Sequence, residues 1–188
     1  IVKKTSLMAY SKPRQGGVIG LTIDKGDRLI GAELCDGKSD ILLATEKGFS
    51  IRFSEKEARP IGRTGRGVRG IRLKPDDRVV GAEIVHPGNM LLTITSNGYG
   101  KRTQLEEYPV QGRGGLGVMT IRCNEKIGSV VGIQQVTEND QLLVITSDGN
   151  IVRMKVDEIS VIGRNTQGVR LVGTGESNQV VSVEKLVE

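Results

Sequence analysis

The sequence predicts an all-β protein built from repeated four-stranded sheets that are arranged as blades around an axis. A block of residues recurs about every 50 positions. Each block contains two short strand-like runs joined by a turn signal, which is typical of a β-hairpin. No stretch has helical periodicity long enough for a substantial helix. Sheets repeated at this spacing need neighbours, because one blade cannot bury both of its faces alone.

The repeat is defined first by a hairpin segment. Three segments align on a shared glycine: ILLATEKGFSIRF (41–53), MLLTITSNGYGKRT (90–103) and QLLVITSDGNIVRM (141–154). In each segment a glycine is followed four residues later by an arginine: Gly48 and Arg52, Gly98 and Arg102, Gly149 and Arg153. A match of this length is too long to arise by chance, so the chain contains an internal repeat.

Two further landmarks recur with the hairpin. A Gly-Arg opening and a Gly-Val close are shared by GRTGRGV (62–68), GRGGLGV (112–118) and GRNTQGV (163–169), and a truncated form is RQGGV (14–18). An apolar pair follows in each copy: Leu29-Ile30, Val79-Val80, Val130-Val131 and Val180-Val181. We therefore divide a partial domain, residues 1–188, into four approximate copies: residues 1–39, which lack the opening strand, 40–88, 89–139 and 140–188.

The hairpin of the second copy shows the expected local structure. Leu42–Thr45 and Phe49–Phe53 are apolar or alternating runs and are expected to pair as antiparallel strands. A type I′ turn is predicted between them, because such a turn needs positive φ at both central residues and favours Asn-Gly or Asp-Gly. The turn residues in the three copies are Lys47-Gly48, Asn97-Gly98 and Asp148-Gly149.

Two more strands are expected in the same copy, at Val68–Leu73 and Arg78–Glu83, on either side of the turn residues Pro75–Asp77. Each copy would then form its own four-stranded sheet. Single helical turns are expected at Ser54–Ala58 and Val156–Ile159. An open solenoid of sheets is the competing arrangement.

The charge and the two cysteines indicate what kind of partner and compartment the protein has. Lys and Arg number 27 against 22 Asp and Glu, giving a net charge of +5 and a pI near 9.3, which favours a polyanionic partner. Cys35 and Cys123 lack the spacing of a disulfide framework or a zinc site, which fits a reducing cytoplasm. No apolar run is long enough for a membrane helix, and the first residues do not read as a signal peptide. We expect the chain to be a piece of a longer protein.

Four segments carry a resemblance to a known family: NGYGKRT (97–103), EYPV (107–110), GRTGRGVRGIRL (62–73) and EISVIGRNTQGV (158–169). With them the chain closely resembles the C-terminal domain of the DNA gyrase A subunit, with the tail of the topoisomerase IV A subunit as the near relative. The resemblance covers essentially the whole chain. The family's signature box, QRRGGKG, has no full match, since residues 111–117 keep its glycine frame but have lost two of its three basic residues. We expect that box upstream of Ile1.

The resemblance implies a fold, a function and partners. The fold is a β-pinwheel, a set of propeller-like blades whose outer rim binds and bends double-stranded DNA. The domain would work with the remainder of the gyrase A subunit, together with the B subunit, in the cytoplasm and on the chromosome, to support ATP-driven negative supercoiling. A topoisomerase IV tail, which orients DNA without full wrapping, is the alternative.

The same resemblance places the chemistry of the enzyme elsewhere. The family's catalytic tyrosine and metal-binding acids belong to other domains, so no catalytic, cofactor-binding or metal-binding residue is assigned in this chain. ATP and Mg are expected only in other domains or subunits of a type II topoisomerase, and no contact with a membrane is expected.

Two sets of basic residues are candidates for contact with DNA. Glycine-framed loops let backbone amides approach a phosphate while arginines supply charge, and their candidates are Arg63, Arg66, Arg69, Arg113 and Arg164. Residues on the second strand of each hairpin could form a basic stripe: Arg52, Lys101, Arg102, Arg153 and Lys155. The alternative is a structural role, with the glycines serving tight turns and the arginines pairing with acids of their own copy, such as Glu57, Glu107 or Asp157.

The charge of the copies falls along the chain. Basic and acidic residues number seven and four (+3), ten and seven (+3), five and four (+1), and five and seven (−2) in the successive copies. We therefore predict that charge removal at Arg63, Arg66 and Arg69 weakens DNA binding more than removal at Arg164 and Arg170. A protein-interaction propeller is an alternative of another class, but it would need apolar or aromatic anchors, and the chain has three Tyr, two Phe and no Trp.

Overall fold

The computed structural model describes residues 1–175 and 177–186, and within them the regular elements are β-strands and short 3-10 turns, with the first strand beginning at Asp40. The strands are β1 (Asp40–Thr45), β2 (Phe49–Ser54), β3 (Val79–Ile84), β4 (Met90–Thr95), β5 (Tyr99–Gln104), β6 (Val118–Met119), β7 (Val130–Val136), β8 (Gln141–Thr146), β9 (Ile151–Lys155), β10 (Val169–Arg170) and β11 (Val180–Leu186). The turns of helix are η1 (Leu7–Tyr10), η2 (Glu55–Glu57), η3 (Leu105–Glu107) and η4 (Val156–Glu158). In this part of the chain no helix could cross a membrane. The all-β prediction is confirmed.

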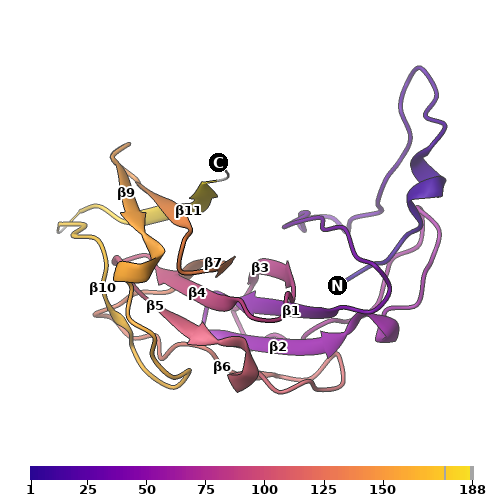
Figure 1. Cartoon of the computed structure of the whole chain (residues 1–188). Helices are drawn as coiled ribbons and strands as arrows, with labels where there is room; N and C mark the ends of the chain where they lie inside the picture. The colour runs from indigo at the N-terminus through magenta and orange to yellow at the C-terminus, as the bar shows by residue number, and fades with distance from the viewer. Residues whose placement is uncertain (176, 187–188) are drawn as a thin grey trace.

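The strands form three antiparallel sheets that follow one another in an arc (Figure 1). Their orders are β3-β1-β2-β6, β10-β5-β4-β7 and β11-β8-β9. On one side of the arc β7 lies between β3 and β11, since Ile133 packs against Gly81 and Val183 against Gly132. Strands β6, β10 and β9 are therefore at the opposite, outer edges of their sheets.

Each hairpin is closed by a glycine, but the turn is not the predicted type I′. The amides of Gly48 and Gly98 each donate to the carbonyl of a threonine three residues earlier at 3.0 Å, and that of Gly149 does so at 2.9 Å. The three glycines have φ of 83°, 78° and 84°, whereas Asp76 is the only residue other than glycine with positive φ in the described chain. A hairpin loop with one left-handed residue needs positive φ only at the glycine. Asn97 and Asp148 therefore keep ordinary backbone angles.

The fourth strand of a sheet comes from the following copy, so the prediction that each copy forms its own sheet is wrong. Val118–Met119 pairs with Phe49 and Ser50, and Val169–Arg170 pairs with Tyr99 and Gly100. Val68–Leu73 forms no strand; Val68 makes a single bridge to Val2 of the first copy. The Gly-rich loop before each short strand carries the chain back across the preceding copy.

The hydrophobic core lies between successive sheets. One buried cluster combines Leu42 and Val85 of the second copy with Tyr108 and Ile121 of the third. A second buried cluster joins the third copy to the fourth. In it Ile94 and Val136 of the third copy pack with apolar side chains of the fourth copy, among them Leu142, Val144 and Val183. Each sheet therefore buries one face against the next sheet, as blades do.

The single helical turns predicted at Ser54–Ala58 and Val156–Ile159 are confirmed as η2 and η4. The equivalent turn η3 occupies the same place in the third copy. These turns lie directly after β2, β5 and β9, where they meet the loops of the next copy.

Candidate nucleic-acid interface

The loops with a Gly-Arg opening lie on the outer side of the arc, because they lead into the edge strands β6 and β10. We call residues 62–67, 112–117 and 163–168 the Gly-Arg loops. Each loop touches the segment that follows the previous loop: the Arg72 amide donates to the Gly115 carbonyl at 2.7 Å, and the Arg122 amide to the Thr166 carbonyl at 2.8 Å. Loops 50 residues apart in the sequence therefore form one continuous row.

Two exposed arginines lie in the first Gly-Arg loop and directly after it. Arg66 and Arg69 are exposed, and Arg63 is half-buried with its guanidinium donating to the Ile19 carbonyl at 2.7 Å. The Arg66 guanidinium pairs with Asp24, but both side chains remain more than half exposed. Exposed pairs of this kind are worth little, so the Arg66 charge remains accessible to an anionic ligand.

Arg113 and Arg164 are held more tightly by the preceding copy. The Arg113 amide donates to the Glu57 carboxylate at 3.0 Å, and its guanidinium reaches the carbonyls of Glu57 and Arg69 at 3.1 Å. The Arg164 amide donates to the Glu107 carboxylate at 3.0 Å, and its guanidinium donates to the Met119 carbonyl at 2.9 Å. Both residues thus join copies as well as adding charge to the row.

The first loop lacks the acid that partners the other two. Glu57 and Glu107 lie five residues after Arg52 and Arg102, which bridge to the following copy. Lys4 makes the equivalent bridge in the first copy, and five residues later the chain has Ala9. Ala9 therefore stands where Glu57 and Glu107 stand in the next two copies. Because no carboxylate occupies this position beside the first loop, the positive charge of that loop is less neutralised than that of the other two.

The second predicted set does not form a basic stripe, because most of its charged groups bind protein oxygens. Lys101 and Arg102 are 0% and 5% exposed. Arg52 donates to Asp40 at 2.9 Å and to the Leu105 carbonyl at 3.0 Å. Lys155 and Arg153 are exposed on β9, where Arg153 donates to the Gln141 side chain at 2.6 Å. The suggested partner acids Glu57 and Glu107 accept backbone amides of the next copy instead.

Two further exposed arginines belong to the row but were not predicted from the sequence. Arg72 and Arg122 lie nine residues after Arg63 and Arg113, and each is positioned by the next Gly-Arg loop. The Arg122 guanidinium donates twice to the Asn165 side-chain oxygen, at 3.0 and 3.3 Å. Their recurrence at the repeat spacing was a signal that could have identified them.

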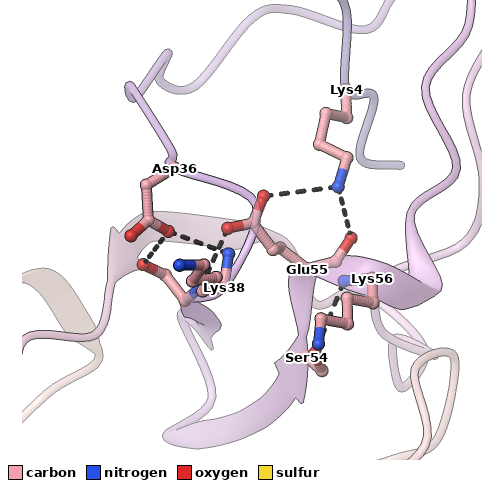
Figure 2. Close-up of polar contacts among 7 residues, drawn as sticks. Lys4, Asp36, Lys38, Ser54, Glu55 and Lys56 are labelled. Atoms are coloured by element: carbon pink, nitrogen blue, oxygen red, sulfur yellow. Dashed lines mark hydrogen bonds and ion pairs between the residues drawn. The ribbon is translucent and has the colours of Figure 1, made fainter.

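A buried acid fixes the first copy to the second and so supports the first loop (Figure 2). Glu55 is 0% exposed, although the equivalent residues of the other copies are Leu105 and Val156. Its carboxylate accepts Lys4 Nζ at 3.3 Å and the Ser39 amide at 2.9 Å. Burial acts to raise the pKa of Glu55, but hydrogen bonds from Cys35, Ser39 and Lys4 outweigh it and lower the pKa. The carboxylate is thus stabilised as an anion.

Comparison with known proteins matches this architecture over the whole chain. The model of the family described as DNA gyrase C-terminal domain, beta-propeller, matches residues 1–36, 39–86, 89–137 and 140–186. The DNA gyrase A subunit of Buchnera aphidicola subsp. Acyrthosiphon pisum is 58% identical over 188 residues, which are 100% of this chain and 23% of that protein. The chain thus spans about a quarter of that relative's length.

Two solved structures have the same fold. The C-terminal domain of DNA topoisomerase IV has a TM-score of 0.92 and 26% identity, covering 98% of this chain and 58% of that one. The DNA gyrase A C-terminal domain has a TM-score of 0.84 and 27% identity, covering 92% of this chain and 59% of that one. The chain belongs to the family of DNA gyrase C-terminal β-propeller domains.

Proposed function

We propose that this chain binds duplex DNA along the row of Gly-Arg loops and bends it around the outer side of the arc. The observation that carries the proposal is the continuity of the row, in which the segment after each loop contacts the next loop. Exposed guanidiniums at Arg66, Arg69, Arg72 and Arg122 are suited to phosphate oxygens. Phosphate contacts position DNA without reading its bases, so binding is expected to tolerate any sequence.

The proposal extends to the longer protein. As a C-terminal part of the DNA gyrase A subunit, the chain would present bent DNA to the rest of that polypeptide, together with the B subunit, for ATP-driven negative supercoiling. The catalytic residues, ATP and Mg would belong to those other parts, and the site of action would be the chromosome in the cytoplasm. The family match supports this assignment.

A titration of the chain with a fluorescent duplex of several helical turns, at a series of salt concentrations, tests the proposal. The logarithm of the binding constant should fall by about 0.9 per decade of salt for each phosphate neutralised. An arrangement that contacts five phosphates would lose roughly 4.5 decades of affinity per decade of salt. Binding that is absent at low salt, or that is insensitive to salt, would contradict the proposal.

A second candidate is the role of a topoisomerase IV tail, which orients DNA without full wrapping. The TM-score of 0.92 to the topoisomerase IV domain supports it. Ligation of nicked circular DNA in the presence of the chain separates the two roles. Trapped writhe after ligation indicates wrapping, whereas tight binding with no trapped writhe indicates orientation alone.

A further inference from the structure

Three consecutive polar side chains of β5 add hydrogen bonds to the junction between the third and fourth copies. The Arg102 guanidinium donates to the Ile159 carbonyl at 2.7 Å, and the Thr103 hydroxyl to the Ile162 carbonyl at 2.8 Å. Lys101 Nζ donates to the carbonyls of Gly163 and Arg164 at 2.6 and 2.5 Å. Residues 159–164 are therefore fixed on β5 through their carbonyl groups.

Lys101 completes this junction at the start of the third Gly-Arg loop. Besides the two carbonyls, its ammonium donates to the Thr166 hydroxyl at 3.0 Å, so each of its three N–H donors has an oxygen partner. The side chain is 0% exposed. A charged group that is buried and fully bonded in this way holds a loop in place and is not available to a ligand in solvent.

The equivalent junction between the second and third copies keeps an arginine, since Arg52 donates to the Leu105 carbonyl at 3.0 Å, but the two positions that flank it are apolar. Ile51 and Phe53 occupy the positions of Lys101 and Thr103 in β2, both are buried, and Ile51 packs toward Gly115 of the second Gly-Arg loop. In the first copy the position of Lys101 is again a lysine, and Lys3 Nζ donates to the Arg63 carbonyl. Lysine junctions thus fix the first and third loops, and an apolar contact fixes the second.

We propose that Lys101 is a positioning residue, which sets the Gly-Arg loop of residues 163–168 on the third copy and thereby sets the angle at which DNA leaves that copy. It acts through the loop, by hydrogen bonds to Gly163, Arg164 and Thr166, and makes no contact with DNA itself. This inference rests on the proposed function for its effect on DNA, but not for its effect on the loop.

The test compares Lys101→Met with Ile51→Met, which places the same side chain at the equivalent apolar position. In the free chain, hydrogen exchange of the amides of residues 163–168 should become about tenfold faster in Lys101→Met, the factor expected when hydrogen bonds to one charged group are removed. Exchange in residues 112–117 should not change. Ile51→Met should leave exchange in residues 163–168 as in the wild-type chain.

Two measurements on DNA separate positioning from direct contact. In Lys101→Met the bend of a bound duplex, read by energy transfer between its ends, should decrease, while the slope of affinity against salt stays the same. A slope that falls by about 0.9 would make Lys101 a phosphate contact and overturn the proposal. Unchanged loop exchange together with an unchanged bend would also overturn it.

A milder variant guards against loss of the fold. Thr166→Val keeps Lys101 and its two carbonyl partners, and should shift loop exchange in the same direction by a smaller factor. No shift in Thr166→Val would count against the proposal even if Lys101→Met does not fold. If the wild-type chain fails to bend DNA, the proposed function fails, and the exchange experiment still decides whether Lys101 positions the loop.

Discussion

At the scale of single residues, the basic side chains of this chain differ in what their charged groups contact. Arg52, Lys101 and Arg102 bind carbonyl oxygens of the following copy and are largely withdrawn from solvent. Arg66 in the first Gly-Arg loop and Arg69 just after that loop are both exposed to solvent. Position along a strand with a two-residue period cannot distinguish these roles, because the burial of Lys101 is imposed by a loop that is 62 residues further along the chain.

The charge gradient gives the first prediction. Arg66→Gln with Arg69→Gln should weaken duplex binding more than Arg164→Gln with Arg170→Gln, because the Arg164 guanidinium already bonds to Met119 and lies 5.9 Å from the centre of the Tyr108 ring. Removing one phosphate contact should lower the salt slope by about 0.9. Fluorescence titration at four salt concentrations measures both effects. Equal reductions in affinity for the two pairs would contradict the gradient.

A second prediction concerns the pH dependence of stability. Burial lowers the pKa of Lys101 to about 8, with Glu107 opposing the shift and Arg164 adding to it. Between about pH 8 and the ordinary lysine pKa near 10.4, the unfolded chain keeps a proton that the folded chain has lost, so folding becomes more favourable as pH rises. We therefore expect the difference in free energy of unfolding, wild-type chain minus Lys101→Met, to increase by roughly 1 to 3 kcal/mol between pH 7.5 and pH 10. A constant difference in urea unfolding over that range would show that folding does not lower the pKa of Lys101.

At the scale of elements, the exchange of short strands between copies organises the molecule. The hairpins were predictable because an apolar run, a glycine and an alternating run are adjacent in the sequence. The turns η2 and η4 were predictable because they too are formed by neighbouring residues. The partner of the Gly-Val strand was not predictable. A repeat of constant length gives the same pattern whether Val118 pairs within its own copy or with Ser50 of the copy before.

The pairing of β6 with β2 of the preceding copy depends on close approach of the two backbones at a glycine, which gives a third prediction. Gly117 has φ of 74°, and a Cβ at this position would lie 2.1 Å from the Ser50 carbonyl oxygen. Gly117→Ala should therefore lower the free energy of unfolding by about 2 to 4 kcal/mol, from backbone strain and displacement of β6. Gly62→Ala is the matched control, since a Cβ there meets nothing within 4 Å. Equal stability of the two variants in urea would refute the docking of β6 at this glycine.

At the scale of the whole molecule, the arc converts a repeat in sequence into a curved row of positive loops. The sheets share cores with their neighbours, so the curvature is set by packing between copies and not by any one sheet. The resemblance to gyrase C-terminal domains was carried by motifs of the Gly-Arg loops and hairpins. The continuity of the row could not be inferred, because it depends on contacts such as Arg122 with Asn165, 43 residues apart.

The most direct test of the central claim is the shape of bound DNA. A duplex of about 40 base pairs, labelled at both ends, is measured by energy transfer with the chain at saturating concentration and low salt. The row of loops on a curved edge predicts that the ends approach one another on binding, because deforming DNA by tens of degrees costs only about 1 to 6 kcal/mol, which several phosphate contacts can offset. Saturated binding with an unchanged distance between the ends would contradict the account.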